Sequence, residues 1–314
     1  LRLPGLDSVG GRTTGAKLIP EQFGGADGVA HQAIPEAEEV LDQEYPVLDR
    51  GFVRLVDYLG GDQRIVQSAR VSYGAGTKSY RQDRGLINYL LRNEHTSPFE
   101  QVVLTFHTKM PIFVARQWVR HRTARLNEIS GRYSVMEPEF YLPEPNHIAA
   151  QSGDNKQGRE TTPMSQEEGA EVRQSLEKSY QEAYRTYQEL LDRGVARELA
   201  RVCLPLSLYT EWYWQIDLHN LFHFLKLRVD PHAQYEIRAY GEVMLDITRR
   251  VAPIAVEAFE EHIRGGVRYS KREQETLSST APDDGDLREA ARAAGLEGKA
   301  LERFLQKVGE GRSS

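Results

Sequence analysis

The chain has 314 residues, of which 39% are hydrophobic and 27% charged, with 40 Lys and Arg, 46 Asp and Glu, and one cysteine, Cys203. This composition excludes a disordered or collagen-like chain and allows one large domain or two. A single thiol excludes an intrachain disulfide and a four-thiolate zinc site, and it is typical of a reducing, cytoplasmic compartment. The net charge of −6 gives no overall reason to bind nucleic acid. No apolar run approaches the roughly 20 residues of a membrane-spanning helix, so no membrane contact is expected.

Patterned sequence begins only after a long N-terminal stretch. Residues 1–47 contain paired glycines and scattered prolines, which predict a flexible or draped arm. Alternating apolar and polar side chains predict a strand in residues 51–59. A helical face in residues 84–93 is followed by strand alternation in residues 102–107. Pro111 suits the first turn of a further helix, which should turn four apolar side chains inward: Phe113, Val114, Trp118 and Val119.

The second half of the chain is mainly helical in pattern. Residues 149–166 are polar and aperiodic, which predicts a surface loop. Residues 167–193 carry apolar side chains at helical spacing, and Gly194 is well placed to end that helix. The other expected elements are a helix in 197–204, a strand in 208–216, and helices in 219–227 and 232–263.

The order of these elements predicts the fold class and the domain boundaries. Strands and helices are interspersed without strict alternation, so we expect an α+β fold with an antiparallel sheet flanked by long helices. The composition changes after residue 270. We therefore expect one domain in residues 48–270, followed in residues 271–314 by a linker and a short helical tail.

The densest chemical feature is an arginine run in residues 116–132, which hold five arginines. So many positive charges are costly unless an anion or several carboxylates compensate them. Arginine suits a bidentate grip on phosphate, and Gly131 beside Ser130 lets phosphate oxygens approach the backbone closely. The run predicts a phosphate or nucleotide site. The alternative is a solvated basic face.

A second cluster holds two histidines one helical turn apart. His219 and His223 have the spacing of a two-histidine metal site, and Asp217 or His232 could supply a third ligand of a hydrolytic zinc. However, residues 220–222 lack the glutamate of the familiar zinc protease motif. Cys203 lies in an apolar context with no neighbouring histidine, which indicates an inert core thiol.

Several segments together resemble one known family. Arg120-His121-Arg122 followed by seven residues and Ser130 resembles the R-H-R-x7-S signature of the flavin-dependent thymidylate synthases, ThyX. Three further elements agree in order and spacing: His95-Thr-Ser97-Pro98-Phe99-Glu100, Arg197-Glu-Leu-Ala-Arg201 with Leu204-Pro205, and Leu227-Arg228 with His232-Ala-Gln234-x-Glu236. The resemblance covers about residues 50–265.

The resemblance implies a fold, a reaction and an assembly. ThyX enzymes are homotetramers of an α+β fold, with active sites where subunits meet. They methylate dUMP to dTMP with FAD, NADPH and 5,10-methylenetetrahydrofolate, without an enzyme nucleophile and without a metal. The flavin supplies the redox chemistry, and the protein positions and polarises the reactants.

The resemblance also implies the site residues. The residues implied to contact FAD are Ser97, Arg120, His121, Arg122, Glu128, His219 and His223, with Ser72 and Glu100 as further candidates. Those implied to bind dUMP are Gln117, Arg120, Glu128, Ser130, Gly131, Arg132, Arg201 and Arg228. Arg228 is the implied catalytic residue, since its charge can stabilise negative charge on the N3–O4 side of the uracil ring.

The chain departs from the family at two positions, and two other functions stay open. Asp217 and His219 stand where many members have Asn and Arg, while His223 is Asn in some relatives and His in others. One alternative is a non-catalytic nucleotide- or RNA-binding protein that uses the arginine run, with salt-dependent affinity. The other is the zinc hydrolase on His219 and His223.

Overall fold

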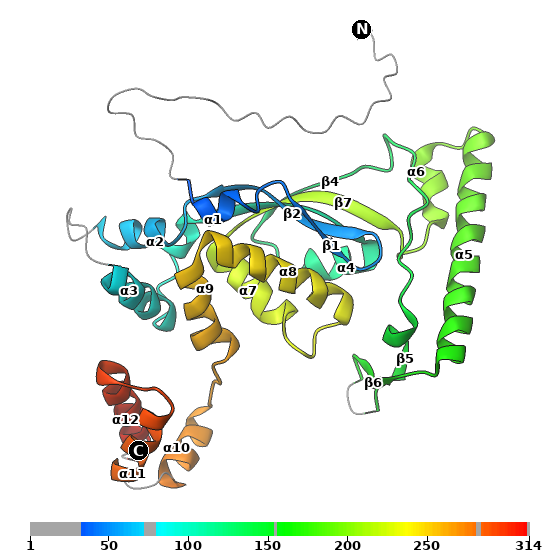
Figure 1. The fold of residues 1–314 in the computed structure, drawn as a ribbon. Coiled ribbons are helices and arrows are strands. Elements are labelled where there is room, and N and C mark those ends of the chain that lie inside the picture. The colour runs from blue at the N-terminus through cyan, green and yellow to red at the C-terminus, as the bar shows by residue number, and fades with distance from the viewer. Residues whose placement is uncertain (1–32, 72–79, 154–155, 281–283, 313–314) are drawn as a thin grey trace, which may run out of the picture. The chain divides into compact units, whose positions relative to one another are not determined.

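The computed structural model describes residues 33–71, 80–153, 156–280 and 284–312 (Figure 1). The chain divides into two units, Leu1–Ala33 and Ile34–Ser314. The second unit is built on a five-stranded antiparallel sheet, which confirms the α+β expectation. In spatial order its strands are β1 (Glu44–Val47), β2 (Gly51–Leu59), β3 (Val103–Pro111), β7 (Tyr209–Asp217) and β4 (Arg125–Glu128).

One face of the sheet carries the core. Helices α4 (Ile112–Trp118), α7 (Leu218–Arg228) and α8 (Tyr235–Val251) contact the strands, and Figure 1 shows α7 and α8 along the same side of the sheet. Alternate side chains of the central strands point into this layer because successive residues of a strand face opposite sides. The largest of these buried side chains are Phe106, Trp212 and Trp214.

The expected single helix in residues 232–263 is wrong, because the helix is interrupted at Ala252. There φ is −141° and ψ is 70°, and Pro253 begins a new helix, α9 (Pro253–Phe259), followed by a π-helical turn, η5 (Glu260–Arg264). Proline lacks the N–H that a continuing helix needs, but it fits a first turn. The carboxylate of Asp62 accepts the N–H groups of Ile254 and Ala255 at 2.8 and 2.9 Å, so α9 is capped from α2 (Asp62–Ala69).

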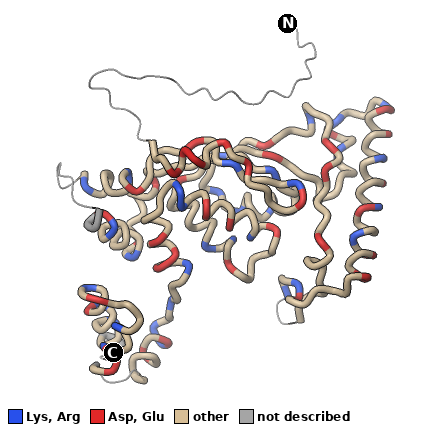
Figure 2. Tube along the Cα trace, viewed as in Figure 1, with Lys and Arg blue, Asp and Glu red and all other residues tan. Residues whose placement is uncertain are grey.

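The long helix expected in residues 167–193 is confirmed as α5 (Gln166–Asp192). Ser165 and Glu168 form a capping box at its start, and Gly194 follows it at φ +76°, a conformation that glycine adopts without strain. Only Gly169 and Tyr187 of α5 are buried. Figure 2 shows both charge signs interspersed along the helix.

The surface loop expected in residues 149–166 is only partly irregular. Strands β5 (Ala149–Gln151) and β6 (Arg159–Pro163) pair as a small antiparallel hairpin. Polar composition concealed this hairpin because both strands are short and mostly exposed. The remaining elements are α1 (Pro35–Glu38), α3 (Tyr80–Arg92), η2 (Phe99–Gln101), η3 (Pro145–His147), α6 (Arg197–Ala200), η4 (Arg201–Cys203), α10 (Lys271–Thr280), α11 (Asp284–Ala293) and α12 (Gly298–Arg312).

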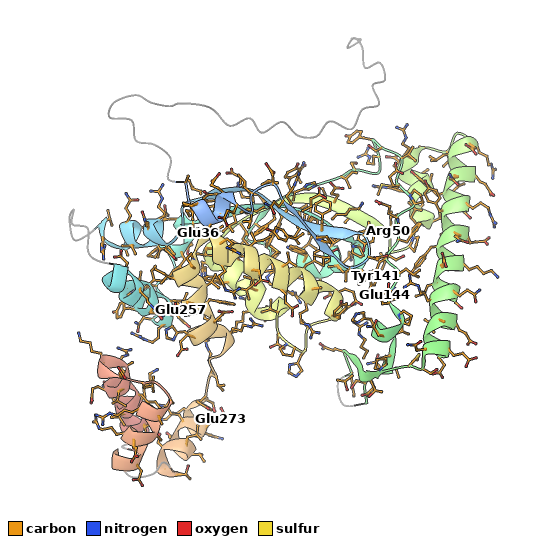
Figure 3. The ribbon with its side chains drawn as sticks, in the orientation of Figure 1. Glu36, Arg50, Tyr141, Glu144, Glu257 and Glu273 are labelled. Atoms are coloured by element: carbon orange, nitrogen blue, oxygen red, sulfur yellow. The ribbon has the colours of Figure 1, made fainter. Side chains whose placement is uncertain are left out.

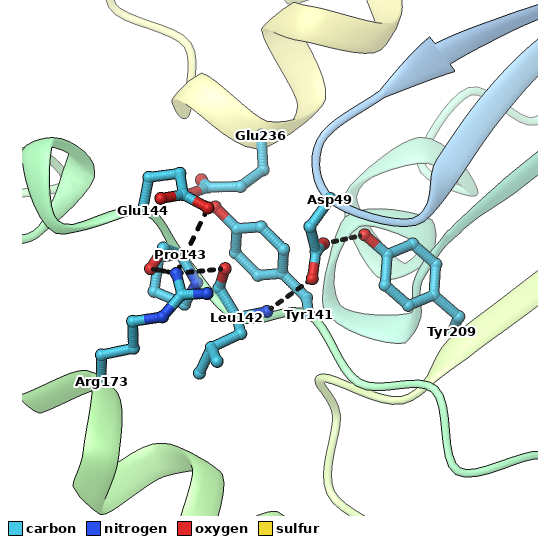
Figure 4. Close-up of polar contacts among 8 residues, drawn as sticks. All are labelled: Asp49, Tyr141, Leu142, Pro143, Glu144, Arg173, Tyr209 and Glu236. Carbon is cyan, nitrogen blue, oxygen red and sulfur yellow. Dashed lines mark hydrogen bonds and ion pairs between the residues drawn. The ribbon is translucent and has the colours of Figure 1, made fainter.

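Polar contacts tie the segment before the hairpin to the turn between β1 and β2, to α8 and to α5, and the N–H of Leu142 donates to Asp49 at 3.2 Å (Figure 4). Tyr209 donates its hydroxyl to Asp49 at 2.6 Å, and Tyr141 donates to Glu236 at 3.1 Å. Burial raises the pKa of both tyrosines, so they remain protonated donors. Arg173 of α5 donates to the carbonyl oxygen of Pro143 at 2.8 Å. Figure 3 places Tyr141 and Glu144 between the sheet and α5.

Two boundaries and the position of one side chain differ from the expectations. Ala37, Val40 and Val47 are buried in the core, so the body begins near residue 34, before the expected boundary at residue 48. Val119, expected to point inward, is 45% exposed, because α4 ends one residue earlier. The segment expected to link the tail is partly helical, since α10 runs through residue 280. In the described part of the chain, no helix is long and apolar enough to cross a membrane.

The Asp62 carboxyl should make the stability of the fold depend on pH. Burial raises its pKa from 3.8 to about 6, although the two N–H groups act in the opposite direction. Because the folded-state pKa lies above the unfolded one, its stabilising contribution is full below about pH 4 and is lost as the pH rises through about 6. Asp62→Asn keeps an acceptor oxygen and cannot ionise. The free energy of unfolding of the variant, relative to that of the wild type, should therefore rise by about 2–3 kcal/mol between pH 4 and pH 8.

Urea unfolding curves of both proteins, recorded at the same protein concentration and at each pH, measure this difference. A difference that stays constant from pH 4 to pH 8 would contradict the assignment to Asp62.

Candidate active site

The site begins at the end of α4, where Trp118 is completely buried. The rings of Trp212 and Trp214 meet it edge to face at 5.5 and 5.4 Å, and the ring of Phe224 lies 4.9 Å away. Such aromatic contacts strengthen the packing beyond the area that they bury. Trp118 therefore fixes α4 against β7 and α7, and the arginine run leaves the helix from a rigid point.

Next to Trp118, three predicted site residues come together. Arg228, at the end of α7, donates from Nε to His121 Nε2 at 3.2 Å and from Nη2 to the carbonyl oxygen of Gln117 at 3.2 Å. The Gln117 side chain in turn donates to the side-chain oxygen of Gln234, which precedes α8. These contacts hold the guanidinium group of Arg228 in one orientation although it is only half-buried.

His121 is neutral in this arrangement. Burial lowers its pKa to about 4, and the positive charge of Arg228 and the neighbouring His223 act in the same direction. A neutral imidazole has one ring nitrogen without a proton, so Nε2 can accept the hydrogen bond from Arg228 while Nδ1 carries the proton. The ring of His223 lies 5.5 Å from that of His121.

The arginine run continues as β4, an edge strand that the sequence pattern did not predict. Its four residues are all exposed, and β4 forms only because it pairs with β7, with Glu128 opposite Trp212. Glu128 accepts the hydroxyl of the buried Thr210 at 2.5 Å. A strand of this length without an apolar face carries no periodic signal, so its partner decides its conformation.

Beyond β4, the predicted phosphate-binding residues gather around a backbone turn. A Cβ atom on Gly131 would lie 3.2 Å from Arg201 Cδ and 2.8 Å from Met136 Sδ, so a larger residue there would displace the Met136 side chain. The backbone N–H of Arg132 donates to Ser130 Oγ at 3.3 Å, and its guanidinium group pairs with Glu198 at 3.3 Å. The turn thus presents two exposed arginines, a hydroxyl and a tight backbone to an anion.

The implied flavin residues on α7 line a pocket of about 690 Å³, a size typical of ligand sites. It is walled by the end of α3, the turn after it, α7, η5 and one residue of α12. Its polar lining residues are Arg92, Glu94, His95, Thr96, His219, His223, Lys226, Glu261, His262, Arg268 and Lys307. This set combines histidine donors, which suit the ring acceptors of a cofactor such as FAD, with cations that suit phosphate groups.

The structure does not bring all of the predicted residues together within one chain. The turn at Ser130 contacts the Arg201 segment after α6, whereas the pocket adjoins α3, and Figure 1 shows α6 and α3 at opposite ends of the sheet. Ser97, Arg120 and Arg122 are exposed.

The remaining candidate residues take the following places. Glu100 accepts the Thr96 hydroxyl at 3.0 Å, and Cys203 donates to the Ala200 carbonyl oxygen at 3.2 Å, as a structural thiol would. Ser72 lies outside the described residues. Among the residues that are described, no three His, Cys, Asp or Glu side chains are grouped as a metal ion needs, and so His219 and His223 have no third ligand there.

The sequence pattern assigned no role to two residues that support this site. Gln234 fixes the Gln117 side chain and Thr210 fixes Glu128. Gln234 belongs to one of the family motifs, but its partner lies 117 positions away in the chain. Thr210 is one residue of an apolar strand, and nothing in its sequence context marks it.

The pKa of His121 can be tested directly. Removing the charge in Arg228→Met should raise this pKa part of the way towards 6.5, because burial, the largest cause, remains. An NMR titration of the imidazole protons measures the change. Lys226→Met is the matched control, since it removes a charge from the same helix that does not act on His121. An equal rise in both variants, or none in Arg228→Met, would contradict the pairing.

Comparisons with known proteins agree with this geometry. The model of the Thy1 family, described as thymidylate synthase complementing protein, matches residues 54–254. The chain is 60% identical over 272 residues to a flavin-dependent thymidylate synthase of Treponema denticola, a match that covers 87% of this chain and 99% of that protein. A flavin-dependent thymidylate synthase of Thermus thermophilus is 53% identical over 263 residues, covering 84% and 95%.

A solved structure agrees as well. The crystal structure of the UMP/dUMP methylase PolB from Streptomyces cacaoi, bound with 5-Br UMP, superimposes with a TM-score of 0.64 at 36% identity, covering 69% of this chain and 97% of that chain. The family match spans the arginine run, β7 and α7, which build the cluster around Arg228. The predicted resemblance is thereby confirmed, and the chain belongs to the Thy1 family of flavin-dependent thymidylate synthases.

Proposed function

We propose that this chain converts dUMP to dTMP by reductive methylation. The carbon comes from 5,10-methylenetetrahydrofolate, and the hydride comes from FAD that NADPH has reduced. The observation that carries this proposal is the Arg228 guanidinium group, held by a neutral His121 and by the Gln117 carbonyl oxygen beside a pocket rich in donors. Family membership supports the methyltransferase activity and the flavin.

The nucleotide would lie along the arginine run. Arg132, Arg201 and the turn at Ser130 and Gly131 supply the charge and the close backbone that a phosphate needs, and the arginines bind it with charge-assisted hydrogen bonds. The residues proposed to bind dUMP are Gln117, Arg120, Glu128, Ser130, Gly131, Arg132, Arg201 and Arg228.

Arg228 would act on the uracil ring. Its guanidinium group can stabilise negative charge that develops on the N3–O4 side, and two fixed hydrogen bonds remove the cost of orienting it during the reaction. Burial lowers the pKa of Arg228, but an arginine remains charged at neutral pH. A fixed charge in a partly desolvated position stabilises such an anion better than a mobile charge in water.

The flavin would occupy the pocket on α7. The residues proposed to contact it are Ser97, Arg120, His121, Arg122, Glu128, His219 and His223. When bound, FAD supplies the hydride chemistry that no side chain can supply. The residues of this chain would hold it, keep His121 neutral and exclude water from the Arg228 side.

No enzyme nucleophile is needed in this proposal. Cys203 donates to a backbone carbonyl oxygen and lies on η4, and no histidine is hydrogen-bonded to it in the described structure. The single thiol also supports a reducing compartment, and we infer that the reaction takes place in the cytoplasm.

We further propose that the working enzyme is a homotetramer with active sites between subunits. Two observations support this assembly. The phosphate-binding turn and the α7 pocket lie at opposite ends of one sheet, so a second copy would have to bring them together (Figure 1). In addition, large apolar side chains are exposed around that turn, a feature typical of protein interfaces: Leu126, Ile129, Tyr133, Val135, Leu199, Val202 and Leu206.

An absorbance spectrum tests the function as a whole. Purified protein should show the bands of bound flavin, and dUMP with methylenetetrahydrofolate should reoxidise the reduced flavin with formation of dTMP. Protein that takes up no FAD on reconstitution would overturn the proposal. Salt-dependent binding of RNA without a flavin spectrum would instead support a nucleotide-binding module.

Two arginine variants should separate catalysis from substrate binding. Arg228→Ala should retain bound FAD and lose dTMP formation by about 10²-fold or more, because the charge acts on the reacting ring. Arg201→Ala should mainly raise the KM for dUMP, by about tenfold or more, because it removes a contact to the phosphate. Steady-state kinetics with flavin absorbance as the control for folding measure both. Retained turnover in Arg228→Ala would refute its catalytic role.

A further inference from the structure

The pocket on α7 has a basic wall that the proposed flavin contacts do not use. Four cationic side chains and two carboxylates line the pocket. One of these carboxylates, Glu94, is already paired with Arg268. The three remaining cations, Arg92, Lys226 and Lys307, have no carboxylate within ion-pair distance in the described part of the chain, and Glu261 is the one unpaired acid of the lining. We call these three cations the basic wall.

Neighbouring charges increase this imbalance. Arg303, one turn before Lys307 on α12, faces Arg92, and burial together with this like charge lowers the pKa of Arg92. His262 donates to the side-chain oxygen of Asn88 at 3.0 Å, and its pKa is lowered first by burial and then by Arg92, Arg303 and Lys307, with Glu261 opposing. Like charges held together in this way are costly unless an anion joins them.

The elements that carry the basic wall place it in the same pocket as the flavin residues. Lys226 follows His223 by three residues on α7, so the two side chains lie on the same side of that helix. Arg92 ends α3 and Lys307 comes from α12, while the π-helical turn η5 supplies Glu261 and His262. π-helical turns within helices are frequent at functional sites.

We propose that the basic wall binds the phosphate groups of the dinucleotide reductant, NADPH, while its nicotinamide reaches the flavin. This inference rests on the proposed function and adds a subsite to it. Phosphate groups carry up to two negative charges each and match three unpaired cations, whereas a carboxylate carries one. In the proposed flavin site, Arg120 and Arg122 of the arginine run would be the cations that meet the phosphates of FAD.

The test neutralises the wall without altering the proposed flavin contacts. Arg92→Gln, Lys226→Gln and Lys307→Gln are made singly and together. Lys299→Gln is the matched control, because Lys299 is exposed on the same helix as Lys307 and does not line the pocket. The rate of flavin bleaching by NADPH is measured against NADPH concentration by anaerobic stopped flow. The affinity for FAD is measured separately. In a third assay the enzyme is reduced with dithionite, and dTMP formation is followed against methylenetetrahydrofolate concentration.

The combined variant should raise the half-saturating NADPH concentration by about tenfold or more, because it removes several charge-assisted contacts. Added salt should weaken NADPH binding to the wild type more than to this variant. FAD affinity and the dithionite-initiated reaction should stay at the level of the control. If the combined variant fails to fold, the exposed Lys307→Gln change alone must still raise the NADPH concentration needed.

Three outcomes would overturn this inference: an unchanged NADPH dependence, a fall in FAD affinity, which would assign the wall to the flavin, or a changed folate dependence alone. Failure of the proposed function is distinct, since wild-type protein would then hold no FAD or form no dTMP after reduction by dithionite.

Discussion

The burial of Trp118 among the aromatic rings of β7 and α7 is the constraint on which the candidate site depends. Trp118 is the last residue of α4, so its packing fixes where the chain leaves that helix. Gln117 precedes it and His121 follows three residues later, and both meet Arg228 from α7, whose Phe224 packs on the same ring. The aromatic core thus decides the positions of polar groups that are themselves only partly buried.

Charge is distributed unevenly over this framework. The chain has a net charge of −6, yet the arginine run and the basic wall concentrate positive charge where few carboxylates compensate it. Partial burial keeps His121 neutral, so that it can accept a hydrogen bond from Arg228 instead of repelling it. A protonated His121 would have no lone pair for that bond and would add a like charge.

The sheet sets the distances between the parts of the site. Its edge strand β4 carries the arginine run away from α4 towards α6, whereas α7 returns beneath the sheet to the pocket beside α3 (Figure 1). The proposed nucleotide and flavin sites therefore lie apart within one chain. Large apolar side chains are exposed around the Ser130 turn, and the proposed tetramer would cover them.

The sequence by itself determined the α+β class, the long helix α5 with its glycine end, the strands β2, β3 and β7, and the residues of the arginine run, because apolar periodicity and motif spacing are local properties. It missed β4 and the β5–β6 hairpin, and it carried one helix through Ala252. β4 and the start of α9 depend on partners far along the chain, Trp212 and Asp62, whereas the hairpin strands are too short and exposed to give a periodic signal. Only the tertiary structure decided that His121 is neutral, that Gln234 supports Gln117, and that Arg92 and Lys307 share a pocket with His223. Burial and long-range charge set these properties, and neither can be read from neighbouring residues.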